Sequence, residues 1–455
     1  MIIRMKNFLA IKDEIELNLN RVNLFIGANN CGKSTFAKLQ NLTQKNYWRT
    51  QSIMDNLSHE NDISIIPSLS FHDYDVYYDL GNVSNDTNEN QDISLSFESQ
   101  MREVNFKLIL EFSPDSRETA NQGVGNQKAA SMKRFELFAN NNLLASQSEN
   151  SVKLNFAEIF RALFVSKFID EMGVSRFISD FENAKEQFIG HGKEIWEYKS
   201  DDVIYSSESV FQAYRQEHQG NRMCYTLSAE LINSLTAQLL MPLRNLSVIS
   251  DQTTTRLDQE SYWKVNDFLN EFGLTLEHVE AVPRNDGEVL PKIMGLQWLL
   301  KQHGQIRLAD SFGSGTSTLL NYLKRIAHLS TEANAGGIND LVLIEEPERN
   351  LHPDWQIKFM ELILGNLKTQ RIIVETHSIY LLRVLQLAVL KKSINPEEIT
   401  IHEFYRDKND VVRVSPITID KNGMLSRDFY GGFNSGLLDL EKELWLRQQG
   451  RIKAN

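Results

Sequence analysis

Eight residues near the start of the sequence have the types and spacing of a phosphate-binding loop. Gly27-Ala-Asn-Asn-Cys-Gly-Lys-Ser34 follows the apolar run Val22–Ile26 and precedes residues 34–57, where we expect a helix. A loop of this pattern wraps backbone N–H groups around the phosphates of a nucleotide. Lys33 would reach the β- and γ-phosphates, and the Ser34 hydroxyl would bind Mg²⁺. The residues expected to contact the nucleotide are Gly27, Asn29, Asn30, Cys31, Gly32, Lys33, Ser34 and Thr35.

Two carboxylates follow an apolar strand far along the chain. Leu341-Val-Leu-Ile344 predicts a buried parallel strand, and its end is a usual place for handling Mg²⁺ and water in nucleotide hydrolysis. We expect Glu345 to hold the metal and Glu346 to act as the general base toward the attacking water. The alternative is that these carboxylates have no catalytic role and only form a solvated strand end before a helix. About 310 residues separate this strand from Lys33, so one nucleotide-binding fold would carry a large insertion between its two halves.

Two weaker signals accompany these motifs. Phe312-Gly-Ser-Gly-Thr316 opens the apolar helix Leu319–Leu329, and a helix that starts with small residues can bind an anion, although such caps are common. The candidate phosphate contacts in this segment are Gly313, Ser314 and Gly315. His377 ends another apolar strand, where a histidine is often an ordinary surface residue, but its spacing from Glu346 suits a contact to a γ-phosphate.

The elements that must position these residues are of both α and β type. Alternating apolar residues predict several short strands. The expected strands are Ile2-Ile3, Ile15–Leu19, Val22–Ile26, Ile93–Phe97, Val104–Phe112 and Phe135–Phe138. A turn at 140–142 should fold the last of these back as a hairpin, and loops are expected at 82–92 and 116–131. Apolar residues three and four apart predict a helical insertion over 155–238, without the heptads of a coiled coil.

We therefore expect an α/β P-loop head, made of a mixed sheet and an antiparallel β subdomain, with a large helical insertion and a short C-terminal α/β tail. The expected segments are an N-terminal lobe with the phosphate loop at 1–154, a mainly helical insertion at 155–300, a C-terminal lobe with the other motifs at 301–390 and a tail at 391–455. The tail ends in a basic helix, Leu437 to Lys453, and is a candidate contact for a partner or for oligomerisation.

Composition and charge exclude several classes of protein. The 455 residues are 41% hydrophobic and 24% charged with nine prolines, which excludes collagen-like, mucin-like and largely disordered chains. Cys31 and Cys224 cannot form a disulfide framework, and no Cys/His cluster suggests zinc. Without a membrane-spanning run or a signal peptide, we expect a cytoplasmic protein with no membrane partner. The net charge of −12 opposes constitutive nucleic-acid binding but leaves a local basic groove open.

The order of the motifs resembles the ABC class of ATPases, in which a phosphate loop, a signature motif, an acidic strand and a switch histidine follow one another. More narrowly, Glu345-Glu-Pro-Glu-Arg-Asn-Leu-His-Pro353 and Glu375-Thr-His-Ser378 are similar to the EEPE-x-x-LHP strand end and the THS switch of OLD-family ATPases. The resemblance covers about residues 1–35 and 305–390. Free-standing proteins of this group and size are similar to ATPases of bacterial anti-phage defence, including the ATPase subunit of PARIS-type systems.

The sequence departs from the ABC pattern in two places. Gly313 stands where the ABC signature usually has a serine, so the hydroxyl that would touch a partner's γ-phosphate comes from Ser314 or is absent. The glutamine that normally links the nucleotide to the rest of the fold could be Gln44, Gln91 or Gln100.

The resemblance implies that the chain binds and hydrolyses ATP with Mg²⁺. The implied catalytic residues are Glu346, His377 and Lys33, and the implied metal ligands are Ser34 and Glu345. Two protomers would sandwich ATP, each phosphate loop facing Gly313–Gly315 of the other chain, so we expect a homo-oligomer that ATP assembles. Such an ATPase would sense a trigger, which could be phage-encoded, and would control a separate effector such as a nuclease or a toxin in anti-phage defence.

Two alternatives from other classes remain. Many OLD proteins carry a Toprim nuclease domain, which needs a glutamate and a DxD pair to hold metals, but no DxD occurs in residues 378–455. A RecF-like DNA-binding ATPase of DNA repair is harder to exclude, because net charge does not locate a DNA-binding groove. The absence of a coiled coil argues against an SMC protein.

Overall fold

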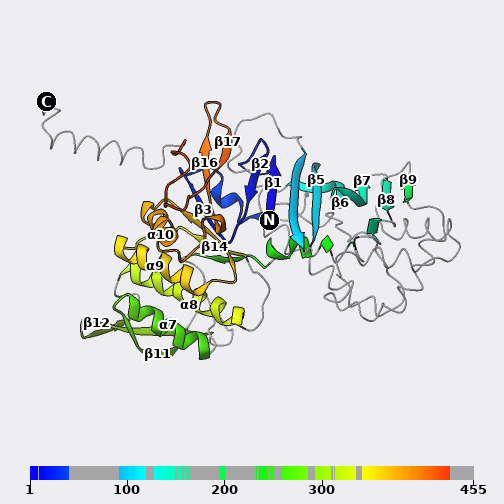
Figure 1. The fold of residues 1–455 in the computed structure, drawn as a ribbon. Helices are drawn as coiled ribbons and strands as arrows, with labels where there is room; N and C mark the ends of the chain where they lie inside the picture. The colour runs from blue at the N-terminus through cyan, green and yellow to red at the C-terminus, as the bar shows by residue number, and fades with distance from the viewer. Residues whose placement is uncertain are drawn as a thin grey trace, which may run out of the picture. The chain divides into compact units, whose positions relative to one another are not determined.

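A computed structural model describes residues 1–39, 92–118, 128–162, 195–199, 232–250, 259–284, 293–311, 313–334 and 341–430, apart from a few residues inside these ranges. The chain divides into two compact units. The first contains Met1–Asn18, Ser34–Asn245 and Asp407–Arg413, and the second contains Leu19–Lys33, Leu246–Arg406 and Val414–Asn455. Figure 1 shows the elements of both units.

The first unit is built on an eight-stranded sheet in which each neighbouring pair is antiparallel, in the order β2-β1-β4-β5-β6-β7-β8-β9. The strands are β1 (Ile2–Lys6), β2 (Ile15–Asn18), β4 (Ile93–Met101), β5 (Val104–Glu118), β6 (Lys128–Ala139), β7 (Asn142–Ser148), β8 (Ser151–Asn155) and β9 (Ile195–Lys199). The expected strands of this region and the hairpin are confirmed. Asn140 and Asn141 adopt φ values of 47° and 68°, as a two-residue hairpin turn with right-handed twist requires.

The expectation of a loop over residues 116–131 is wrong at both ends of this range. β5 continues to Glu118, β6 begins at Lys128, and the two residues pair with each other. Backbone hydrogen bonds carry this pairing, so it does not need the apolar alternation from which the strands were predicted. A strand, β9, also lies inside the segment expected to be helical, whereas residues 158, 159, 162 and most described residues from 232 to 243 are helical. The division into four segments stays a prediction, and residues 40–57 and 82–91 lie outside the described part of the chain.

The second unit contains the sheet that positions the motifs. Its strand order is β10-β14-β15-β3-β16-β17, and each neighbouring pair from β10 to β16 is parallel. The strands are β3 (Val22–Gly27), β10 (Ser247–Ile249), β14 (Leu341–Glu345), β15 (Arg371–Thr376), β16 (Ile399–Arg406) and β17 (Val412–Ile417). Every residue of β3 is buried, as in a central parallel strand that is covered on both faces. The expected P-loop α/β architecture is confirmed.

The strand β16 belongs to this central sheet and not to a separate tail. It pairs with β3 from Ile399↔Val22 to Phe404↔Gly27, which places the phosphate loop between β15 and β16. The first six residues of β16 are buried, so this strand also needs cover on both faces and is stable only inside the sheet. The expected basic helix from Leu437 to Lys453 lies outside the described residues.

Four α-helices and a small sheet complete the part of the second unit that the structure describes. The helices are α7 (Gln259–Glu271), α8 (Ser314–Asn334), α9 (Pro353–Asn366) and α10 (Ile379–Leu390), and the three-stranded antiparallel sheet is β11 (Thr275–Arg284), β12 (Ile293–Gln302) and β13 (Gln305–Leu308). Figure 1 shows α8, α9 and α10 together beside the strands. Their apolar faces and strands β3, β14 and β15 share one buried core, which fixes the strand ends that carry the motifs. No helix among the described residues is long and apolar enough to cross a membrane.

Candidate functional site

The phosphate loop begins where β3 ends. Asn30 and Gly32 adopt positive φ values of 61° and 86°, and alternation of such residues turns successive backbone N–H groups toward one point, where an anion can bind. The Cys31 side chain is 4% exposed, and its thiol lies 3.8 Å from the Asn29 carbonyl oxygen. After Lys33–Thr35 the described chain continues in i→i+3 turns, from Lys38 N to Thr35 O among others, so the helix expected at residue 34 starts as a 3₁₀ turn.

The Lys33 ammonium group is buried inside the loop. Its side chain is 4% exposed, and Nζ donates hydrogen bonds to the carbonyl oxygens of Gly27 at 3.0 Å and Ala28 at 2.9 Å. Burial lowers the pKa of Lys33, while nearby carboxylates, Glu375 first among them, act in the opposite direction. An ammonium that is removed from water and surrounded by carbonyl oxygens binds a phosphate oxygen strongly, because little of its charge is screened.

Gly27 cannot be replaced without moving the neighbouring strand. Its φ is +145°, and a Cβ built at this position would lie 2.0 Å from the carbonyl oxygen of Phe404 on β16. The requirement for glycine therefore comes from the close approach of β16 as well as from the loop conformation.

Gly27→Ala is expected to lower the free energy of unfolding by at least about 2 kcal/mol, because the methyl group adds backbone strain and a collision. Urea denaturation would measure this change. Gly365→Ala in α9 is the matched control, since a Cβ there meets nothing within 4 Å and helix propensity favours alanine. Equal stability of Gly27→Ala and the wild type would show that β16 does not restrict the loop.

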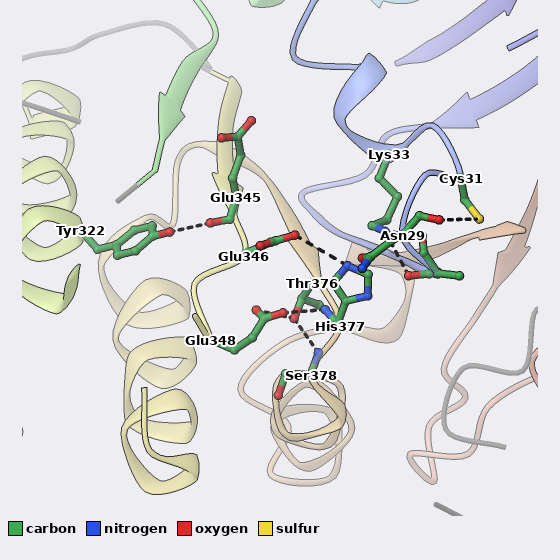
Figure 2. Close-up of polar contacts among 12 residues, drawn as sticks. Asn29, Cys31, Lys33, Tyr322, Glu345, Glu346, Glu348, Thr376, His377 and Ser378 are labelled. Carbon is green, nitrogen blue, oxygen red and sulfur yellow. Dashed lines mark hydrogen bonds and ion pairs between the residues drawn. The ribbon is translucent and has the colours of Figure 1, made fainter. Parts of the chain in front are cut away.

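The ends of β14 and β15 bring the acidic motif and the histidine together. Glu346 N donates to the Glu375 carbonyl oxygen at 2.8 Å, and the Glu346 backbone takes the unusual φ of 40°. This turn directs the Glu346 side chain to His377, whose Nε2 lies 3.7 Å from Glu346 Oε1 (Figure 2). The two side chains are 41% and 33% exposed, so water and a substrate can reach both.

Glu345 takes a different direction from Glu346. Figure 2 shows its carboxylate turned away from Glu346 and His377. Its backbone carbonyl oxygen accepts a 2.5 Å hydrogen bond from the hydroxyl of Tyr322, a buried residue of α8 that also packs edge-on against Phe359. The structure therefore brings the expected base and the expected switch histidine together. The role of Glu345 in metal binding stays a prediction.

Burial and the Lys33 charge favour the neutral form of His377 by lowering its pKa. Burial is the first cause that lowers its pKa from 6.5, and the Lys33 charge is the second, while Glu348 and Glu346 raise it. The proton is thus held less tightly in the folded chain than in the unfolded chain, so the contribution of His377 to stability falls as the pH drops below 6.5.

If neutral His377 is the working form, kcat/KM for ATP should stay constant as the pH falls to 6.5 and should decline only below it. Steady-state rates between about pH 5 and 8 would show this limb. A His377→Asn variant should lose the part of the decline that belongs to His377. If kcat/KM of the wild type already declines well above pH 6.5, and this decline is absent in the His377→Asn variant, the His377 pKa is not lowered.

The proposed signature residues lie at the start of α8. Gly313 has a φ of +113° and, like Ser314, is exposed, so both can meet a ligand or a partner. Gly315 is packed within its own chain, because an added Cβ would lie 2.4 Å from the carbonyl oxygen of Asn350. Ser314 is the first residue of the helix, and a hydroxyl at a helix N-terminus suits an anion.

Sequence reasoning missed three residues that contact this site. Glu348 binds both Thr376 and His377, and Arg406 at the end of β16 donates to the Asn30 carbonyl oxygen of the phosphate loop at 3.0 and 3.3 Å. Tyr322 was the third. Glu348 belongs to the quoted EEPE motif, so its position held a signal, whereas Arg406 carried none.

Of the candidate glutamines, Gln100 lies in β4, and Gln44 and Gln91 are outside the described residues.

The donor set fits a triphosphate with Mg²⁺ better than a permanently held metal. Within the described residues, no group of three or more His, Cys, Asp and Glu side chains could hold a metal ion. Mg²⁺ needs no such cluster, because it usually takes one or two protein carboxylates or hydroxyls and completes its shell with phosphate oxygens and water. The positive-φ loop and the buried Lys33 supply the phosphate half of this arrangement.

Comparison with known proteins gives one strong result. The family described as the AAA ATPase domain matches residues 1–382. A comparison with curated proteins found no match.

Solved structures that resemble the chain include three heads of SMC proteins. One is an SMC head bound to the C-terminal winged-helix domain of ScpA, with 11% identity, a TM-score of 0.40 and coverage of 92% of this chain and 98% of that one. A second, from Thermotoga maritima, has 10% identity, a TM-score of 0.37 and coverage of 91% and 97%. The third, from Pyrococcus furiosus, has 11% identity, a TM-score of 0.37 and coverage of 97% and 98%.

Proposed function

Because the chain belongs to the AAA ATPase domain family, we propose that it hydrolyses ATP at Gly27–Thr35 with Glu346 as the general base. The observation that carries this proposal is the 3.7 Å approach of Glu346 Oε1 to His377 Nε2, beside a phosphate loop that contains a buried lysine. A carboxylate and a histidine at adjacent strand ends can act together on one water and one phosphoryl group.

Each side chain has a distinct part in this reaction. The Lys33 ammonium binds the β- and γ-phosphate oxygens. Glu346 orients the attacking water and accepts its proton. Neutral His377 donates or accepts a hydrogen bond at the γ-phosphate. Ser34 and Glu345 are the proposed ligands of Mg²⁺, which supplies positive charge to the phosphates when it is bound.

We propose further that the site is completed by a second copy of the chain. The supporting observation is that Gly313 and Ser314 are exposed at the start of a long helix and suit an anion. ATP held between the phosphate loop of one protomer and these residues of the other would stabilise the dimer by linkage, and hydrolysis would release it.

An ATPase of this kind works as a switch. We propose that it senses a trigger, such as a phage-encoded one, and controls a separate effector such as a nuclease or toxin in anti-phage defence. The support is the resemblance of Glu345–Pro353 and of Glu375–Ser378 to the motifs of OLD-family defence ATPases.

ATP turnover of the purified chain tests the enzymatic proposal. Release of phosphate with Mg²⁺ should be measurable in the wild type and lost in Lys33→Ala, since removal of the buried ammonium leaves the triphosphate without its strongest contact. Lys358→Ala is a matched control, because Lys358 lies on α9 and donates to the Glu271 carbonyl oxygen. Turnover that survives in Lys33→Ala would place the activity elsewhere or in a contaminant.

Phage challenge tests the proposed biological role. Cells carrying this gene with its genomic neighbours should reduce phage plating, and Lys33→Ala should restore it. Protection that persists without a working phosphate loop, or no protection against a broad phage panel, would contradict the defence role and leave the ATPase proposal untouched.

A further inference from the structure

Glu348 links the ends of the two strands that carry the base and the switch histidine. Its Oε1 accepts a 2.6 Å hydrogen bond from the His377 backbone N–H, and its Oε2 accepts a 2.7 Å bond from the Thr376 hydroxyl. Figure 2 shows this carboxylate lying between the turn after β14 and the end of β15. A charged acceptor makes both bonds stronger than ordinary amide bonds.

These bonds form beyond the last paired residues of β14 and β15. The paired register of β14 and β15 ends at Glu345↔Glu375, and the next backbone bond runs from Glu346 N to the Glu375 oxygen. His377 N lies beyond this ladder, and Glu348 takes the place of the missing strand partner. The position of the His377 side chain therefore depends on a carboxylate three residues after the strand and not on strand pairing alone.

A second set of contacts connects the same point to two helices. The Thr376 hydroxyl accepts a bond from Ser378 N at 2.9 Å, and the Ser378 hydroxyl donates to Gln356 of α9 at 2.6 Å. Ser378 also caps α10 by accepting from Tyr380 N at 3.2 Å. Thr376 thus orders the turn on one side while Glu348 holds it on the other.

We propose that Glu348 is a positioning residue that fixes His377 opposite Glu346 by binding the His377 N–H and the Thr376 hydroxyl. The inference rests on the proposed ATPase function, to which it adds a residue that touches neither ATP nor the attacking water. Its effect falls on the γ-phosphate end of the site, because His377 is the group that it places. ADP, which lacks that phosphate, should bind independently of Glu348.

The variants separate positioning from charge. Glu348→Gln keeps one oxygen acceptor and removes the charge, Glu348→Ala removes both acceptors, and Thr376→Val removes only the hydroxyl. Glu361→Gln is the matched control, since Glu361 is an exposed carboxylate on α9 that contacts Lys391. Thermal unfolding of each variant would identify any that fails to fold, and Thr376→Val keeps the proposal testable if Glu348→Ala is one of these.

We expect Glu348→Ala to lower kcat by about 10-fold or more and to raise KM for ATP as the γ-phosphate contact weakens, because a misplaced group near the reacting atoms is costly. Glu348→Gln should recover part of the loss, Thr376→Val should resemble a partial loss, and the Glu348→Ala/Thr376→Val double variant should be less impaired than the product of the single effects. ADP affinity, measured by calorimetry, should match the wild type, while affinity for a non-hydrolysable ATP analogue falls.

Four results would overturn the proposal: wild-type kcat in Glu348→Ala, equal loss in Glu348→Gln and Glu348→Ala, multiplicative effects in the double variant, or equal loss of ADP and ATP-analogue affinity. A wild-type chain without turnover would contradict the proposed ATPase function instead. The ratio of ATP-analogue to ADP affinity would then still decide whether Glu348 places His377.

Discussion

Glu346→Gln is expected to lower ATP turnover by about 10²-fold or more, the usual size of a general-base contribution. The amide keeps the shape of the side chain and can still approach His377, but it cannot accept a proton. Glutamine should also tolerate the backbone φ of 40° as well as glutamate does, so the turn after β14 should persist. ATP should still bind, and the ATP-linked dimer should accumulate because hydrolysis no longer releases it.

Two measurements decide this prediction. Single-turnover hydrolysis separates the chemical step from product release, and size-exclusion chromatography with light scattering follows the dimer. Glu345→Gln is the informative comparison, because loss of a metal ligand should raise the Mg²⁺ concentration needed for activity, whereas loss of the base should not. Wild-type turnover in Glu346→Gln, together with a large loss in Glu345→Gln, would mean that the roles of the two carboxylates are reversed.

The sequence predicts the sheet around the site because its central strands are buried on both faces. Leu341–Ile344 is a continuous apolar run and Val22–Ile26 is apolar except at Asn23, which is the pattern of covered parallel strands, and they form β14 and β3 as expected. The chemistry at their ends follows from the same pattern, since parallel strands place their carboxyl ends at one edge. Glu346 and His377 meet for this reason.

The placement of β16 could not be predicted in the same way. Its residues were expected only to belong to a short α/β tail. Its neighbour β3 is more than 370 residues earlier, and local sequence does not indicate which strand will be adjacent. The consequence reaches the site, because the close contact of Phe404 with Gly27 and the contact of Arg406 with Asn30 exist only in that pairing. Long-range pairing decides both contacts.

Glu348 and Tyr322 show a second limit of sequence reasoning. The sequence predicts an apolar helix over Leu319–Leu329, which contains the buried Tyr322, but not that the Tyr322 hydroxyl reaches the carbonyl oxygen of Glu345. Likewise, the hydrogen-bond partners of Glu348, three residues after β14, cannot be predicted until the register of β14 and β15 is known. Polar contacts across elements depend on that register to within a residue.

The second large effect concerns the proposed composite site. Lys33→Ala and Ser314→Asp should each be nearly inactive alone, and a mixture of the two should recover part of the activity. Ser314 is preferable to Gly315, where any side chain would collide with Asn350 of the same chain. An aspartate at the first residue of α8 suits the helix dipole, so folding should be kept. Toward a partner's γ-phosphate the same charge is repulsive. Ser314→Asn, equal in size to the aspartate variant and without charge, is the control and should retain more activity than Ser314→Asp.

The expected recovery follows from how the sites are shared. A mixed dimer has one site with two altered halves and one with two intact halves. In a freely exchanging equal mixture about half of the dimers are mixed, which gives about a quarter of wild-type turnover if the sites are independent. Coupling between the sites would lower this value. Subunit exchange must be shown first, for example by co-purification of two differently tagged chains.

A covalently linked dimer removes the ambiguity of a negative result. With both substitutions in one half, the trans arrangement leaves no intact site, because the intact phosphate loop faces the altered Ser314 position and the altered loop faces the intact one. A site contained within one chain would instead leave one working half. With one substitution in each half the outcomes reverse, since trans sharing leaves one intact site and sites within single chains leave none. About half of wild-type turnover in the first linked dimer and none in the second would rule out composite sites, even if unlinked chains failed to complement.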